Sequence, residues 1–198
     1  MNHSLPNWLT LARLFMIPLV LGCYYLPVLG GPGAAAAIFL LASVTDLVDG
    51  YLARRWQQTT AFGAFLDPVA DKLLVTFALI VVLQQDPRLL VALPAAVIIA
   101  REIVVSALRE WMAEAGHRGR VAVSQWGKVK TLVQMAALAL LLLGAQHSPL
   151  EYRLGLAALW VAAALTLWSM LLYLMGAWSV LSGGPAARSP GGAKVDDA

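Results

Sequence analysis

The chain has 198 residues, of which 60% are hydrophobic and 13% are charged, and its mean hydropathy is +0.74. Such a composition is typical of an integral membrane protein and argues against a soluble domain. The net charge of +3 is too small to indicate a nucleic-acid partner, and a single cysteine cannot form an internal disulfide.

The first long apolar segment is residues 14–45, which carry no charge over 32 residues. One transmembrane helix needs only about 20 residues, so this segment is too long for a single span. Pro27 and the run Gly30–Gly33 interrupt it, because proline and clustered glycines break helices. The segment therefore predicts two helices, at about 7–28 and 33–56.

Four further apolar segments predict four more helices. They are the segment that follows Lys72 and ends at Gln84–Pro87, the segment from Leu89 toward Arg109, residues 125–145, and the segment from Leu154 to about Leu181. The sequence thus predicts an all-α polytopic membrane protein with six transmembrane helices in one domain, residues 1–182. Residues 183–198 are rich in Gly, Pro and Ser and are expected to form a disordered tail. Because the sixth segment has almost no polar group, we expect it to face lipid or a second subunit.

The distribution of Lys and Arg predicts the orientation of these helices. If the N-terminus is cytoplasmic, only Arg88 and Arg153 of the 14 Lys and Arg residues lie outside and Arg101 lies within a helix, which leaves 11 inside. Cytoplasmic loops of membrane proteins carry such an excess, so we expect both termini in the cytoplasm. The strongly polar groups inside the helices then all lie at cytoplasmic helix ends, and this predicts a polar pocket that opens to the cytosol.

Four aspartates are the most informative residues of that pocket. Asp46 and Asp49 share one helical face, as do Asp67 and Asp71, so two adjacent helices can bring four carboxylates together. Carboxylates inside a membrane are expensive and repel one another unless cations neutralise them. Oxygen ligands without His or Cys favour Mg²⁺ or Mn²⁺. The alternative explanation is a set of buried ion pairs between these acids and nearby arginines.

The aspartates form part of a longer pattern, D-x2-D-G-x2-A-R-x8-G-x3-D-x3-D, which begins at Asp46 and ends at Asp71. This pattern resembles, at every fixed position, the signature of the CDP-alcohol phosphatidyltransferases. Residues 6–13, 62–72, 100–114 and 121–131 resemble the bacterial phosphatidylglycerophosphate synthases of that family. The likeness covers about residues 5–180.

The resemblance implies an enzyme that transfers the phosphatidyl group of CDP-diacylglycerol to sn-glycerol 3-phosphate and releases CMP. It implies two Mg²⁺ or Mn²⁺ ions held by the four aspartates, with Asp71 as general base or as a further ligand. It also implies a homodimer in the lipids of the bacterial inner membrane, with the active site facing the cytoplasm. Because family members place the nucleotide against the signature helix, we assign the following residues to CDP-diacylglycerol: Asn7, Thr10, Gly50, Ala53, Arg54 and Gly63.

An acceptor with its own phosphate needs additional cations. The candidates lie at the cytoplasmic ends of the fourth and fifth helices: Arg101, Arg109, Lys128 and Lys130. For Lys128 and Lys130 the alternative is an ordinary role in membrane orientation. Glu102 is interpreted as a structural partner for one of these bases rather than as a catalytic acid.

Two other functions remain open at this point. The same family includes enzymes for other acceptors, namely serine, inositol phosphate or phosphatidylglycerol, but the basic residues favour a phosphorylated acceptor. A divalent-cation carrier would also use membrane aspartates. A carrier needs polar groups in both halves of the membrane, however, and here the outer halves are apolar.

Overall fold

The computed structural model describes residues 5–56, 61–114 and 125–181. For residues 5–9, 47–56, 61, 62, 64, 125–128, 145–147 and 179–181 it describes the helix but not the side chain. Within these ranges the chain is helical and contains no strand, which confirms the predicted all-α class. The elements are α1 (Leu5–Tyr25), the short 3₁₀ helix η1 (Pro27–Leu29), α2 (Gly31–Trp56), α3 (Ala61–Gln85), α4 (Leu89–Glu114), α5 (Gln125–His147) and α6 (Pro149–Leu181).

The connection between α1 and α2 lies where the sequence predicted a break. Pro27 begins the 3₁₀ turn, and Gly30 and Gly31 follow with φ angles of 104° and 66°. Glycine adopts this left-handed region without a steric penalty, which explains two glycines in succession. The second helix begins at Gly31 rather than at residue 33, because Pro32 fits the first turn of a helix, where its missing N–H has no partner to lose.

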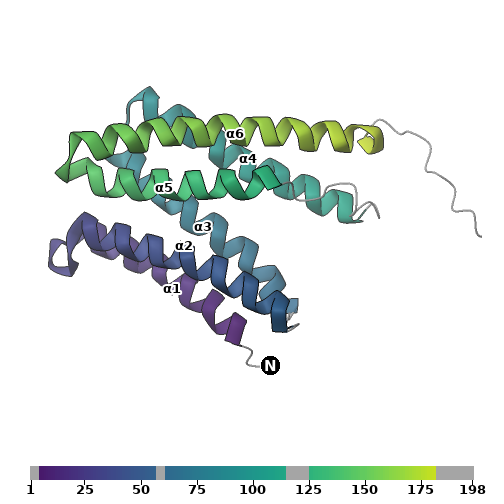
Figure 1. Ribbon diagram of the computed structural model, residues 1–198, viewed down its shortest axis with the longest axis horizontal. Helices are drawn as coiled ribbons and strands as arrows, with labels where there is room; N and C mark the ends of the chain where they lie inside the picture. The colour runs from purple at the N-terminus through teal and green to yellow at the C-terminus, as the bar shows by residue number, and fades with distance from the viewer. Residues whose placement is uncertain (1–4, 57–60, 115–124, 182–198) are drawn as a thin grey trace, which may run out of the picture.

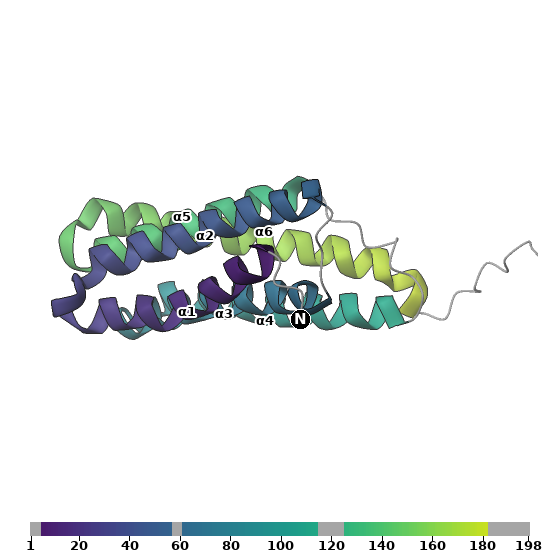
Figure 2. The same ribbon diagram turned by 90° about the horizontal axis from the view of Figure 1, so that it is seen from below.

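The helices pack as two hairpins joined by α3 and α4. Helices α1 and α2 lie side by side, as do α5 and α6, while α3 contacts α1, α4 and α5, and α4 packs against α6. Figure 1 shows the two hairpins in the lower and upper halves of the view, and Figure 2 shows α2 beside α5. Buried side chains from every helix except η1 fill the space between them, and examples are Ile17, Phe39, Leu79, Ile98, Leu142 and Leu159.

Two glycines bring α5 and α6 unusually close together. A methyl group on Gly144 would lie 2.5 Å from the backbone nitrogen of Tyr152, and one on Gly155 would lie 2.9 Å from Leu141 Cγ. Real side chains do not approach backbone atoms at such distances. The α5–α6 hairpin therefore depends on the absence of a side chain at Gly144.

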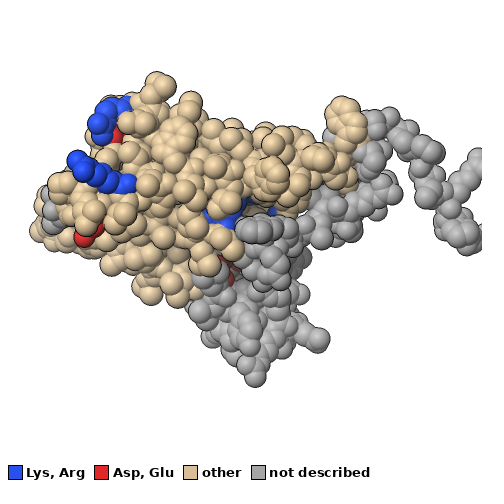
Figure 3. All heavy atoms as spheres, turned by 45° about the horizontal axis from the view of Figure 1, so that its top comes forward, with Lys and Arg blue, Asp and Glu red and all other residues tan. Residues whose placement is uncertain are grey.

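The outer surface of the bundle is largely apolar. Phe15, Trp168 and Trp178 are each more than 60% exposed, and most of the face in Figure 3 is free of charged atoms. By length and composition, two helical stretches in the described part of the chain are sufficient to cross a membrane, Leu89–Glu114 and Pro149–Trp178. Shorter apolar stretches lie in α1, α2 and α5. The six helices are confirmed, whereas their orientation across the membrane stays a prediction.

Candidate active site

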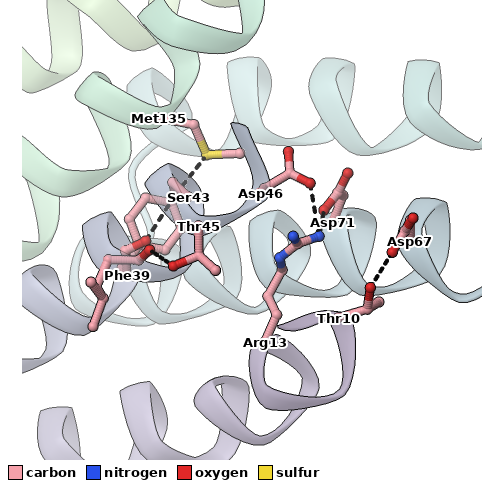
Figure 4. Close-up of polar contacts among 10 residues, drawn as sticks. Thr10, Arg13, Phe39, Ser43, Thr45, Asp46, Asp67, Asp71 and Met135 are labelled. Carbon is pink, nitrogen blue, oxygen red and sulfur yellow. Dashed lines mark hydrogen bonds and ion pairs between the residues drawn. The ribbon is translucent and has the colours of Figure 1, made fainter. Parts of the chain in front are cut away.

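Helices α1, α2 and α3 bring together the three aspartates of the D-x2-D…D-x3-D pattern whose side chains the structure describes. Asp46 lies on α2, while Asp67 and Asp71 lie one turn apart on α3. Helix α1 supplies Thr10 and Arg13, which are three residues apart and face the same way (Figure 4). The structure thus places the polar faces of three helices against one another at a single position.

Arg13 connects two of these acids. Its Nη1 atom forms an ion pair with Asp46 Oδ1 at 2.8 Å and donates a hydrogen bond to Asp71 Oδ1 at 2.5 Å (Figure 4). The Arg13 side chain is completely buried, so it is enclosed between the helices rather than extended to the surface. The alternative explanation from the sequence, an ion pair between the acids and an arginine, is therefore present in part, and one guanidinium serves two carboxylates.

The third described acid has a different partner. The Thr10 hydroxyl donates a hydrogen bond to the Asp67 carboxylate. Thr10 is buried, so this bond lies inside the helix packing. Among the described contacts, the three carboxylates are thus paired with one guanidinium and one neutral hydroxyl. Three negative charges face a single positive charge.

This arrangement fits a divalent cation. Carboxylate oxygens from two helices already converge on one cationic nitrogen, that of Arg13. All the acids present offer oxygen atoms as metal ligands, and these are the ligands that Mg²⁺ and Mn²⁺ prefer. Among the residues whose side chains are described, no three acids, histidines or cysteines form a ready-made cluster. The side chain of Asp49, the fourth predicted ligand, lies outside the described residues. The residues present are suited to such an ion, and the ligand set predicted from the sequence stays a prediction.

The predicted CDP-diacylglycerol residues are only partly described. Gly63 is buried in the first turn of α3, two turns before Asp71, and Thr10 contacts Asp67. Asn7 belongs to α1, and Gly50, Ala53 and Arg54 belong to α2, but their side chains lie outside the described residues.

A second polar cluster joins α4 to α5. Glu102 Oε1 accepts hydrogen bonds from Arg101 Nη1 at 2.8 Å and from Lys130 Nζ at 2.9 Å. The Arg101 and Lys130 side chains are 9% and 4% exposed, so both charges are held inside the bundle. The predicted role of Glu102 as a structural partner agrees with these contacts, and it serves two bases rather than one. Lys128 lies in α5, and its side chain is outside the described residues.

The two clusters lie at the same end of the bundle. The Ser43 hydroxyl on α2 contacts the Met135 sulfur on α5 at 3.4 Å, and the two helices run in opposite directions (Figure 2). Asp46 follows Ser43 by three residues, and Lys130 precedes Met135 by five. At 1.5 Å per residue, these steps carry both residues about 4–8 Å toward the same end. Asp46 and Lys130 therefore lie at similar depth along the bundle.

Helix α6 also contributes polar groups, which the sequence analysis missed. Ser169 accepts a hydrogen bond from Arg101 Nη2 at 3.4 Å, and the Tyr173 hydroxyl accepts one from Arg109 Nη2 at 2.7 Å. The Arg109 guanidinium carbon also lies 5.1 Å from the centre of the Tyr173 ring. Besides the face expected to meet lipid or a second subunit, α6 therefore has a second face that turns toward α4. The opposite face, which includes Trp168, remains exposed.

Arg13 is the other residue that sequence reasoning missed. In the sequence it is one of the 11 Lys and Arg residues that predict the orientation, and arginines beside apolar segments are common for that reason. The available signal was its position three residues after Thr10, which places it on the helix face already assigned to the site.

A family model described as CDP-alcohol phosphatidyltransferase matches residues 3–168. The chain is 55% identical over 177 residues to a protein of Sodalis glossinidius and 56% identical over 177 residues to proteins of Escherichia coli K12 and Shigella flexneri. Each match covers 89% of this chain and 96% of the relative. All three relatives carry the name CDP-diacylglycerol–glycerol-3-phosphate 3-phosphatidyltransferase.

Proposed function

Since the chain belongs to the CDP-alcohol phosphatidyltransferase family, we propose that it transfers the phosphatidyl group of CDP-diacylglycerol to sn-glycerol 3-phosphate and releases CMP. The names of relatives at 55–56% identity support this reaction. The structural observation that supports it is the convergence of Asp46 and Asp71, from two helices, on one cationic nitrogen, Arg13 Nη1.

The chemistry requires charge neutralisation and a base. A glycerol hydroxyl attacks the phosphorus that carries the diacylglycerol, the bond from that phosphorus to the CMP phosphate breaks, and the hydroxyl proton must leave. The family is generally dependent on divalent metals, and such ions would neutralise the diphosphate and the departing CMP. We assign their binding to Asp46, Asp49, Asp67 and Asp71, and expect two ions, Mg²⁺ or Mn²⁺.

Asp71 is the proposed general base. Its carboxylate lies within hydrogen-bond distance of Arg13, which holds it in a fixed place beside Asp46. A positioned carboxylate can take a proton in the transition state, and the geometry of the donor and acceptor decides its efficiency. The same carboxylate is also a suitable metal ligand.

The substrates are assigned to the two clusters. The diphosphate and cytidine of the donor belong near the acidic cluster, with Asn7, Thr10, Gly50, Ala53, Arg54 and Gly63. The phosphate of the acceptor belongs near the basic residues Arg101, Arg109, Lys128 and Lys130. Arg101 and Lys130 carry two positive charges against the single charge of Glu102, and this excess supports an anionic acceptor over serine.

The chain is a membrane protein. We further propose that it lies in the bacterial inner membrane as a homodimer surrounded by lipid, with both termini and the active site on the cytoplasmic side. The charge distribution along the sequence supports this orientation, since with a cytoplasmic N-terminus 11 of the 14 Lys and Arg residues lie on the cytoplasmic side of the membrane. The division into a catalytic domain, residues 1–182, and a tail, residues 183–198, also stays a prediction.

The reaction is tested with purified protein, CDP-diacylglycerol, labelled glycerol 3-phosphate and Mg²⁺. We expect CMP release and incorporation of the label into lipid, in equal amounts. Serine, inositol phosphate and phosphatidylglycerol serve as competing acceptors and are expected to give little product. CMP release with one of these acceptors but not with glycerol 3-phosphate would retain the family and reject the proposed acceptor.

A further inference from the structure

Helix α6 carries a stripe of polar side chains that neither its composition nor the family assignment explains. Thr166, Ser169 and Tyr173 follow the spacing i, i+3, i+7, which places them on one helix face. Thr166 is completely buried and Ser169 is 6% exposed, although most of the residues of this helix are apolar. Buried polar groups are costly unless they have partners, so this face requires a polar neighbour.

For Ser169 and Tyr173 the neighbour is the row of basic residues on α4, whereas the Thr166 hydroxyl has no hydrogen-bond partner among the described residues. Arg101 donates to Ser169, and Arg109, eight residues further along α4, donates to Tyr173. Arg101 also shares the Glu102 carboxylate with Lys130 of α5. The basic cluster therefore has contacts on α4, α5 and α6, and α6 is the one wall of the three that supplies no charge of its own.

Tyr173 makes two different contacts with Arg109. The hydroxyl accepts a hydrogen bond at 2.7 Å, and the ring lies 5.1 Å from the guanidinium carbon, within the range of a cation–π interaction. Arg109 is exposed and Tyr173 is half-buried. An exposed arginine samples many rotamers, so a partner that fixes one of them lowers the entropic cost of binding an anion.

We propose that α6 forms the third wall of the anion site and that Tyr173 positions Arg109 for the phosphate of the acceptor. This inference rests on the proposed function, because it takes the basic cluster as the acceptor-phosphate site. Tyr173 acts through Arg109 and is a positioning residue. The lipid-facing side of α6 plays no part in it.

The test compares Tyr173→Phe and Tyr173→Leu with the wild type. The phenylalanine variant loses the hydroxyl contact and keeps the ring, whereas the leucine variant loses both. The KM for glycerol 3-phosphate should rise roughly threefold to tenfold in the first variant and further in the second, as expected for loss of a partly exposed charged hydrogen bond. The kcat and the KM for CDP-diacylglycerol should stay near their wild-type values.

The matched control is Tyr152→Phe. It removes a hydroxyl from the same helix at its opposite end, where Tyr152 donates to Asp86. This variant should leave both KM values unchanged. A Tyr173→Phe protein with the wild-type KM for glycerol 3-phosphate would overturn the inference, and this variant is isosteric enough to fold even if the leucine variant does not.

Combination with Arg109→Ala separates the inference from the proposed function. If Tyr173 acts through Arg109, the double variant Arg109→Ala/Tyr173→Phe should have the same KM for glycerol 3-phosphate as Arg109→Ala alone. An increased KM in Arg109→Ala together with no effect of Tyr173→Phe would reject the role of Tyr173 alone. Unchanged glycerol 3-phosphate kinetics in Arg101→Ala, Arg109→Ala and Lys130→Ala would reject the acceptor site itself.

Discussion

The two ends of helix α3 both carry carboxylates, but their partners differ. Past the C-terminal end, Asp86 accepts two hydrogen bonds of 2.7 Å from the Arg88 side chain, and further bonds from the Arg88 backbone and the Tyr152 hydroxyl. Near the N-terminal end, Asp71 shares the Arg13 guanidinium with Asp46. Figure 3 shows the visible charged groups in two separate regions of one face.

This difference separates a structural acid from the acids proposed to be functional. Asp86 has an arginine of its own, only two residues away, and the pair closes the connection between α3 and α4. Asp46 and Asp71 draw their counter-charge from another helix and have to share it. A carboxylate that already accepts hydrogen bonds from its own arginine has few lone pairs left for a metal ion. Carboxylates that outnumber the positive charges around them can bind a further cation.

The largest expected effect is the loss of activity when one of the acids that share Arg13 is neutralised. Asp46→Asn and Asp71→Asn should each lower kcat by at least about 100-fold, because each removes a carboxylate of the proposed metal site or the proposed base. The double variant should be little worse than either single variant, since residues of one catalytic unit are not additive. Asp86→Asn is the control and should stay within about twofold of wild type. Normal turnover in Asp71→Asn would contradict its proposed role as base.

The basic residues at the same end should give the next largest effect. Arg101→Ala, Lys128→Ala and Lys130→Ala should each raise the KM for glycerol 3-phosphate about 10- to 150-fold, because a charge-assisted contact contributes roughly 1.5–3 kcal/mol. The KM for CDP-diacylglycerol should change little. Arg88→Ala removes an arginine that also pairs with an acid, but at the other end, and should affect neither constant. Equal effects of Arg88→Ala and Arg101→Ala on acceptor binding would remove the distinction between the two ends.

A change in the α5–α6 hairpin, near Tyr152, should affect stability rather than catalysis. Gly144→Ala places a methyl group 2.5 Å from the Tyr152 backbone, so the helices have to move apart, at a cost of roughly 1–3 kcal/mol. Gly33→Ala is the control, since no atom outside the local helix backbone lies within 4 Å of its added methyl group. Thermal unfolding in a fixed detergent should show a lower midpoint for Gly144→Ala only. A Gly144→Ala protein as stable as Gly33→Ala would show that the hairpin tolerates separation.

The smallest expected effect is the pH dependence of the Asp86 contacts. The hydrogen bonds from the Arg88 side chain hold the pKa of Asp86 well below its usual range, and the Tyr152 hydroxyl adds to this. A lowered pKa contributes stability that is present above the unfolded-state pKa of about 3.9 and is lost as the pH falls through the folded-state pKa. The melting temperatures of wild type and Asp86→Asn should therefore differ by a constant amount, at most about 4 °C, from pH 8 to pH 5, and converge below about pH 4. A difference that shrinks already between pH 8 and pH 6 would point to another titrating group.

Much of the architecture was predictable because it depends on local signals. The apolar segments and the glycines at 30 and 31 define the helices and their first connection, and the i, i+4 spacing of Asp67 and Asp71 puts both on one face. Glu102 was recognised as a partner for nearby bases because it sits directly beside Arg101.

What could not be predicted depends on packing between distant segments. Arg13 meets Asp71 across 58 positions in sequence, and Tyr173 meets Arg109 across 64. Thr166, Ser169 and Tyr173 are too few among the apolar residues of the 33-residue helix α6 to give an amphipathic pattern, so the sequence alone gives no reason to turn that face inward. The direction in which such a face points depends on the side chains of other helices that form hydrogen bonds with it.

The central claim is that the acids at one end of α3 bind divalent cations and the acid at the other end does not. Electron paramagnetic resonance of Mn²⁺, titrated with purified protein in nanodiscs, tests it without depending on turnover. The account predicts that wild type and Asp86→Asn bind Mn²⁺ and release it to excess Mg²⁺, and that Asp46→Asn and Asp71→Asn bind at least about tenfold more weakly, as expected for one lost carboxylate ligand. Equal Mn²⁺ affinity in wild type, Asp46→Asn and Asp71→Asn would contradict the account.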